Sequence, residues 1–205
     1  MTLEALLQGL VAAGQAMSLW EAAAVLLGVA YLLLAMRENL WCWYAGFAST
    51  AIFLVIFWDV NLVMEAGLQV YYLAMSVYGW WHWRSGAAEA SAPLPIHSWR
   101  LKNHVLAIAA VLSAAWISGS LLSNHAEAAL PFLDSFTTWG SVLATWMVAR
   151  KVLENWLYWL VIDSAAIYLY LDRELYLTAL LFAVYLVIAL FGYLQWRQHF
   201  NQQSS

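Results

Sequence analysis

Residues 153–163 read Leu-Glu-Asn-Trp-Leu-Tyr-Trp-Leu-Val-Ile-Asp and open a long apolar segment that continues to Leu171. Trp156, Trp159 and Asp163 follow one another at steps of three and four residues, so on a helix they share one face. Two indole rings and a carboxylate on one stripe of a membrane helix form a candidate site for a flat polar or cationic ligand. The alternative is that the stripe only packs against a neighbouring helix.

The rest of the chain has a similar composition. Of 205 residues, 65% are hydrophobic and 10% are charged, with a mean hydropathy of +0.71, which is typical of a polytopic membrane protein. A spanning helix needs roughly 20 apolar residues. Seven segments meet this requirement, at about 19–36, 41–58, 62–83, 104–122, 131–149, 153–171 and 176–196. We therefore expect an all-α integral membrane protein with seven transmembrane helices and a short lead-in at residues 1–18.

The basic residues predict the orientation of the chain. One set of alternating loops carries only Arg173, whereas the other set carries seven basic residues. These seven are Arg37, Arg84, Arg100, Lys102, Arg150, Lys151 and Arg197. By the positive-inside rule, the N-terminus lies outside and the C-terminus lies in the cytoplasm. We expect a multi-pass protein of the bacterial inner membrane.

Two groups of three segments resemble each other. The matching elements are Tyr78-Gly79-Trp80 and Phe191-Gly192-Tyr193, Trp83-Arg84 and Trp196-Arg197, and Asp59 and Asp172. Glu38-Asn39 and Glu154-Asn155 also match, with a slip of three residues. We predict a 3+1+3 parallel repeat, an architecture that places a transporter's substrate site between the repeats. The alternative is coincidence, because Trp, Tyr and Arg belong at membrane interfaces in any case.

This repeat divides the chain into five parts. The lead-in at 1–18 precedes a first three-helix repeat at 19–84, and residues 85–130 form a linker and a connecting helix. A second three-helix repeat at 131–197 precedes a tail at 198–205.

Three segments carry polar or aromatic side chains at steps of three or four residues. The stripes are Glu65, Gln69, Tyr72 and Ser76; Asp134, Thr138, Ser141 and Thr145; and Asn155 or Trp156, Trp159 and Asp163. A polar stripe must face another helix or a water-filled path, because facing lipid is costly. Ser and Thr stripes are often interhelical contacts only, but three stripes together favour a shared cavity.

Asp163 lies near the middle of its segment, where a carboxylate costs roughly 2.5–3.5 kcal/mol to insert. It therefore needs a partner, water or a ligand; the alternative is a protonated or hydrogen-bonded structural residue. Trp156 lies near the segment end and also fits an aromatic belt, so Trp159 is the better candidate for stacking. Lys151 and Glu154 are three residues apart at the mouth of this segment and either pair or only anchor the helix end.

Several classes of function are excluded. The single Cys42 and five dispersed histidines offer no metal site, and the net charge of −4 without a basic run excludes nucleic acid as a partner. No lysine lies in 176–196 to carry a Schiff base, which excludes a retinal photoreceptor. Asp134 and Asp163 could be imagined as a catalytic pair, but no nucleophile–base arrangement accompanies them. We expect no cofactor and no enzymatic activity.

Three stretches resemble the PnuC-type vitamin transporter family. They are residues 149–159, which include Glu-Asn-Trp-Leu-Tyr-Trp; residues 68–72 with Tyr78-Gly79-Trp80; and Pro131-Phe132-Leu133-Asp134-Ser135 at the start of the fifth segment. The resemblance implies a 3+1+3 fold similar to the SWEET sugar transporters. It also implies uptake of nicotinamide riboside by facilitated diffusion, with trapping through phosphorylation by a separate cytosolic kinase.

The resemblance assigns the family's Trp-x-x-Trp pair to Trp156 and Trp159, and its glutamine to Gln69. The chain departs from the family at Asp163, where members carry an amide, and at Ser49, which we take as its pseudo-symmetric counterpart. Relatives are thought to carry thiamine or riboflavin, and thiamine is also a flat cation. We therefore predict a transporter for a flat cationic vitamin, with nicotinamide riboside first and thiamine or riboflavin as alternatives. A homo-oligomer remains open.

Overall fold

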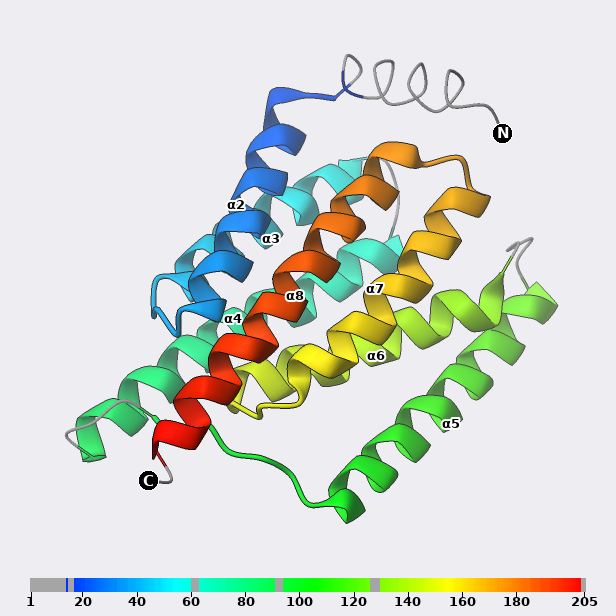
Figure 1. Ribbon diagram of the computed structural model, residues 1–205. Helices are drawn as coiled ribbons and strands as arrows, with labels where there is room; N and C mark the ends of the chain where they lie inside the picture. Colours follow the sequence, from blue (N-terminus) through cyan, green and yellow to red (C-terminus); the bar gives the residue numbers. More distant parts are fainter. Residues whose placement is uncertain (1–13, 15–16, 60–62, 91–93, 126–129, 204–205) are drawn as a thin grey trace.

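The computed structural model describes residues 14, 17–59, 63–90, 94–125 and 130–203, and the regular structure in these residues consists of helices (Figure 1). They are α2 (Leu19–Met36), α3 (Cys42–Asp59), α4 (Val63–Ala90), α5 (Leu101–His125), α6 (Pro131–Ala149), α7 (Asn155–Asp172) and α8 (Tyr176–Gln203). Each of the seven apolar segments corresponds to one helix, so the all-α prediction is confirmed. Most of the expected lead-in lies outside the described residues.

Three helices are longer than the apolar segments, and α5 extends its segment by three residues at each end. Helix α4 continues through the start of the expected linker to Ala90, and α8 continues through most of the expected tail to Gln203. Four of the described helices, α2, α3, α5 and α8, are long and apolar enough to cross a membrane. The other three, α4, α6 and α7, are the helices that carry the polar stripes, and these residues lower their hydropathy.

Six helices form a closed ring in which each helix packs against two others, in the order α2, α3, α4, α6, α7, α8 and back to α2. Helix α5 packs against α6 and lies at the margin of the bundle (Figure 1). Large apolar side chains of α5 point outward, among them Leu106 and Trp116, which are 60% and 68% exposed. Such an exterior fits a lipid environment, because in water it would be a large exposed apolar patch.

Helices α2, α6 and α7 end in the same way. The residues after their C-caps, Glu38, Lys151 and Glu174, have φ angles of 54°, 53° and 58°. In each case the next amide bonds back to the last turn, for example Asn39 N to Leu34 O at 2.9 Å. This is the Schellman motif, in which the left-handed position is usually glycine. None of the three positions is glycine here, so each keeps a charged side chain at some cost in backbone strain.

The buried core is concentrated where α2 and α6 end, which we call the Lys151 end of the ring. Two pairs of indole rings meet edge to face there: Trp43 with Trp83 at 5.3 Å and 85°, and Trp156 with Trp196 at 5.5 Å and 87°. Smaller residues from α2 and α6, such as Ala35 and Ala149, fill the space between them. The Lys151 end is therefore closed by tightly packed side chains.

Candidate functional site

The stripe predicted on α7 faces the interior of the protein. Asn155, Trp156 and Asp163 are only 0%, 1% and 2% exposed, whereas Leu157 and Val161 on the opposite face are 39% and 59% exposed. The local cause is the sequence spacing, since residues three, four and seven positions apart fall on one side of a helix. A carboxylate, an amide and an indole are thus placed inside the ring.

These buried groups are incompletely paired. The Asn155 side-chain nitrogen donates to Val152 O at 2.7 Å. Among the described residues, Asn155 Oδ1, Trp156 Nε1 and Asp163 Oδ1 have no hydrogen-bond partner, and no ion pair involves Asp163. Burying an unpaired carboxylate is costly, so Asp163 is the position where a cationic ligand or a proton contributes most.

The stripes on α4 and α6 lie against each other. The Tyr71 hydroxyl donates to Val142 O at 2.7 Å, which ties the two helices together. One position along each helix, the Tyr72 hydroxyl lies within hydrogen-bonding reach of the Ser141 side chain. Gln69 and Thr138 of the same stripes are half-buried. Hydroxyl and amide groups are therefore available on the α4–α6 side of the interior.

On the other side, Ser49 of α3 donates its hydroxyl to Ala24 O at 2.7 Å. Ser49 and Tyr185 of α8 both contact the same point of α2, because a Cβ placed on Gly28 would be 3.4 Å from Ser49 Oγ and 3.2 Å from Tyr185 Oη. Tyr185 is also close enough to Asp163 to interact with it electrostatically. Tyr185 was not among the predicted site residues, although it lies 113 positions after Tyr72, and the predicted repeat could have identified it.

Two of the predicted site residues, Asp134 and Trp156, are held by close contacts with other parts of the protein. Asp134, at the start of α6, forms an ion pair with Arg173 at 2.9 Å, and both side chains are about one-third exposed, at 35% and 33%. Trp156 packs so closely over Gly192 that a Cβ there would lie 2.7 Å from its ring. Trp159, in contrast, is half-buried at the edge of the core and is the more accessible of the two indoles.

A cavity of about 330 Å³ opens between α5, α6 and α7. Its walls are mostly apolar and include Phe136 and Val161 from the ring and Leu112 from α5 outside it. Neither Asp163 nor Trp159 lines it. This cavity is distinct from the polar interior, and among the residues that line it only Tyr158 carries a polar side-chain group.

An apolar exterior, a ring of helices and buried polar groups facing its interior define a multi-pass membrane protein of the transporter class. The chain belongs to the nicotinamide mononucleotide transporter family, whose sequence profile matches residues 18–198. The family membership predicted from the sequence is thereby confirmed.

Two curated relatives and one solved structure are similar over most of the chain. The riboflavin/roseoflavin transporter RibM of Streptomyces davaonensis is 26% identical over 174 residues, covering 83% of this chain and 81% of the relative. The nicotinamide riboside transporter PnuC of Escherichia coli is 25% identical over 218 residues, covering 95% and 91%. A crystal structure of the vitamin B3 transporter PnuC has a TM-score of 0.71 at 18% identity and covers 96% of this chain and 90% of its own. The relatives are thus transporters, and the solved structure shows that the fold is shared.

Proposed function

We propose that the protein takes up a flat cationic vitamin, with nicotinamide riboside as the first candidate, by facilitated diffusion. The observation that carries this proposal is Asp163, a carboxylate that is 2% exposed and has no cationic partner among the described residues. Similarity to the Escherichia coli transporter of nicotinamide riboside supports the same substrate. A pyridinium ring would supply the missing positive charge.

In the proposed complex, the ligand ring stacks on Trp159 and its charge lies near Asp163. A cation over a desolvated aromatic ring contributes about 2 kcal/mol. The ribose hydroxyls would bond to Tyr72 and Ser141 on one side and to Ser49 or Tyr185 on the other. Contacts of this size favour binding while still permitting release, as a carrier requires.

We also propose that the two halves of the chain, residues 19–84 and 131–197, form a parallel 3+1+3 repeat around residues 85–130. Contacts separated by 113 positions support it, because Trp43 covers Gly79 as Trp156 covers Gly192. The position of α5 outside the ring agrees with a connecting helix. With a constant offset of 113 positions, the two halves align without the three-residue slip assumed for Glu38-Asn39. The counterpart of Asp163 is then Thr50, which is the neighbour of the predicted counterpart Ser49.

The proposed repeat has consequences for transport. Seven spanning helices would place the basic loops and the C-terminus in the cytoplasm of a bacterial cell. Rocking of one half against the other would expose the central site to each side in turn. A cytosolic kinase that phosphorylates the vitamin would then prevent its return.

Riboflavin and thiamine are the alternatives. The relative RibM is a riboflavin transporter and matches most of the chain. Riboflavin has no positive charge in its ring system, however, so it would leave Asp163 unpaired. Thiamine is a flat cation with a hydroxyl tail and satisfies Asp163 as well as nicotinamide riboside does.

Titration calorimetry of the purified protein with nicotinamide riboside, thiamine and riboflavin tests the proposal, together with uptake of each compound into proteoliposomes. We expect one of the two cations to bind and to enter the vesicles without an imposed gradient. Binding of riboflavin alone would overturn the choice of a cationic substrate. Failure of all three to bind or cross would overturn the vitamin-transport proposal itself.

A further inference from the structure

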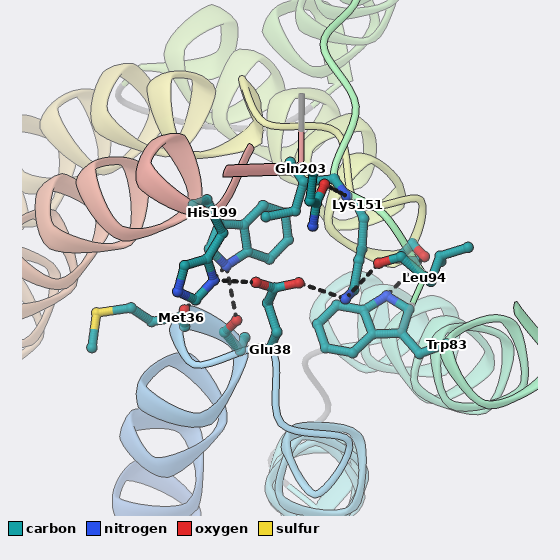
Figure 2. Close-up of polar contacts among 11 residues, drawn as sticks. Met36, Glu38, Trp83, Leu94, Lys151, His199 and Gln203 are labelled. Atoms are coloured by element: carbon teal, nitrogen blue, oxygen red, sulfur yellow. Dashed lines mark hydrogen bonds and ion pairs between the residues drawn. The ribbon is translucent and has the colours of Figure 1, made fainter. Parts of the chain in front are cut away.

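Glu38 and Lys151 form an ion pair across the Lys151 end of the ring. Lys151 Nζ lies 2.6 Å from Glu38 Oε2, and the two side chains are only 3% and 14% exposed for Lys151 and Glu38 (Figure 2). Glu38 follows α2, and Lys151 follows α6, which are the first helices of the two proposed halves. The pair therefore joins the halves at a buried point where both helices end.

Further contacts surround this pair. Lys151 Nζ also donates to Leu94 O at 3.0 Å and lies 4.7 Å from the centre of the Trp83 ring. Glu38 Oε1 lies 2.6 Å from His199 Nδ1 of α8 (Figure 2). Segments following α2, α4 and α6 and the end of α8 thus converge on two charged side chains.

Two indole groups reinforce the junction in a reciprocal manner. Trp83, at the end of the first half, donates from Nε1 to Ala149 O of the second half at 3.0 Å. Trp196, at the end of the second half, donates from Nε1 to Met36 O of the first half at 3.1 Å. The two donors, and likewise the two acceptors, are 113 positions apart, as are Glu38 and Lys151. The junction therefore has approximate two-fold symmetry with one charge of each sign at its centre.

The backbone conformation at Glu38 and Lys151 also indicates that their side chains have a role. Glu38 and Lys151 both occupy the left-handed region, with φ angles of 54° and 53°. Glycine is the least strained residue in such a C-terminal position. A side chain kept there at both positions, and paired across the junction, points to a role that outweighs the strain.

We propose that the Glu38–Lys151 pair and its two flanking indole bonds form a latch that holds the Lys151 end of the ring closed. Only the purpose of the latch rests on the proposed transport function: it would open when the ligand leaves at the Lys151 end. In the closed state described here, the ion pair and the two indole hydrogen bonds join the halves at this end, over a packed aromatic core. Opening breaks the ion pair and exposes that core to water.

Cys42 provides a reporter that needs no ligand. It is the chain's only cysteine, it is 0% exposed, and it begins α3 close enough to Lys151 to interact with it electrostatically. The rate at which a maleimide modifies Cys42 in nanodisc-embedded protein therefore measures how often this end opens. Lys102 is exposed on α5 and provides a control for loss of a lysine elsewhere.

We expect slow modification in the wild-type protein and in Lys102→Met, and modification about tenfold faster or more in Lys151→Met and in the milder variant Glu38→Gln. The double exchange Glu38→Lys with Lys151→Glu should return the rate toward wild type, because both positions share one backbone conformation.

Wild-type rates in folded Glu38→Gln and Lys151→Met would overturn the latch. Equally fast rates in the single variants and the double exchange would also overturn it. If Lys151→Met does not fold, Trp83→Phe, which removes one indole donor, takes its place with the same expected increase. The readout is independent of vitamin binding, so failure of the transport proposal would appear separately in the calorimetry.

Discussion

The ring of Trp156 lies directly over Gly192, with no space for a side chain between them. A Cβ on Gly192 would come within 2.7 Å of the indole, and the same arrangement recurs where Trp43 covers Gly79 at 2.3 Å. Both glycines are in helices and have ordinary backbone angles, so the absence of a side chain is what matters. The two contacts fix α7 against α8 and α3 against α4.

Replacing either glycine by alanine should therefore destabilise the protein. We expect Gly192→Ala and Gly79→Ala each to lower the free energy of unfolding by about 1–3 kcal/mol, because the added methyl group overpacks a rigid indole contact. Chemical unfolding in detergent measures this. Gly67→Ala is the matched control, since a Cβ there meets nothing within 4 Å. A loss of stability at Gly67 equal to that at Gly192 would contradict the packing argument.

Trp156 and Trp159 should separate into a structural and a binding residue. Trp156 is 1% exposed and sits in the aromatic core, so Trp156→Ala should cost about 3–5 kcal/mol of stability. Trp159 is half-buried, and Trp159→Ala should weaken vitamin binding by about tenfold or more through loss of stacking. Titration calorimetry and unfolding of both variants measure the difference.

Trp81 is the control for this comparison, because it is 57% exposed on the outer side of α4. Trp81→Ala should change neither stability nor affinity appreciably. Equal losses of affinity in Trp159→Ala and Trp81→Ala would remove Trp159 from the proposed site.

The helices and the inward stripe of α7 could be predicted from the sequence because both depend on local patterns. Apolar runs of membrane length identify each helix, and the spacing of Asn155, Trp156 and Asp163 identifies one face. The number of membrane-spanning helices is harder to predict from hydropathy than the helices themselves, because only four of the described helices are apolar enough to qualify. Polar residues that face the interior make α4, α6 and α7 less apolar than the helices around them.

Long-range contacts could not be predicted in the same way. The spacing of Lys151 and Glu154 suggested a local pair, but Lys151 binds Glu38 and Glu154 accepts hydrogen bonds from Ser98 Oγ and Trp99 N. The reason is the left-handed turn at Lys151, which directs the side chain across the ring instead of along α7. The sequence gives no signal for this turn, because the left-handed position that glycine usually occupies is a lysine here.

The third left-handed residue offers a test of the strain argument. Glu174 follows α7 with a φ of 58°, its side chain is exposed, and no ion pair of the described residues includes it. Glu174→Gly should raise the free energy of unfolding by about 1 kcal/mol, because glycine adopts this conformation without a steric penalty. Lys151→Gly should do the opposite and lower it by about 3 kcal/mol, since the buried charge of Glu38 loses its partner. Stabilisation by both substitutions would show that the ion pair contributes little.

Asp163 is the residue that should distinguish cationic from neutral vitamins. Asp163→Asn keeps the size of the side chain but removes its charge and replaces one acceptor oxygen by an NH2 donor. We expect affinity for nicotinamide riboside or thiamine to fall by about 10–100-fold, as loss of a charged interaction costs about 1.5–3 kcal/mol, while any affinity for riboflavin stays the same or rises. Asp172→Asn, at the exposed end of the same helix, should leave all three affinities unchanged. Calorimetry of both variants with the three ligands measures these affinities. An equal loss of affinity for all three ligands in Asp163→Asn would make Asp163 a structural residue. A loss of affinity confined to the two cations would make Asp163 the counter-ion of the ligand.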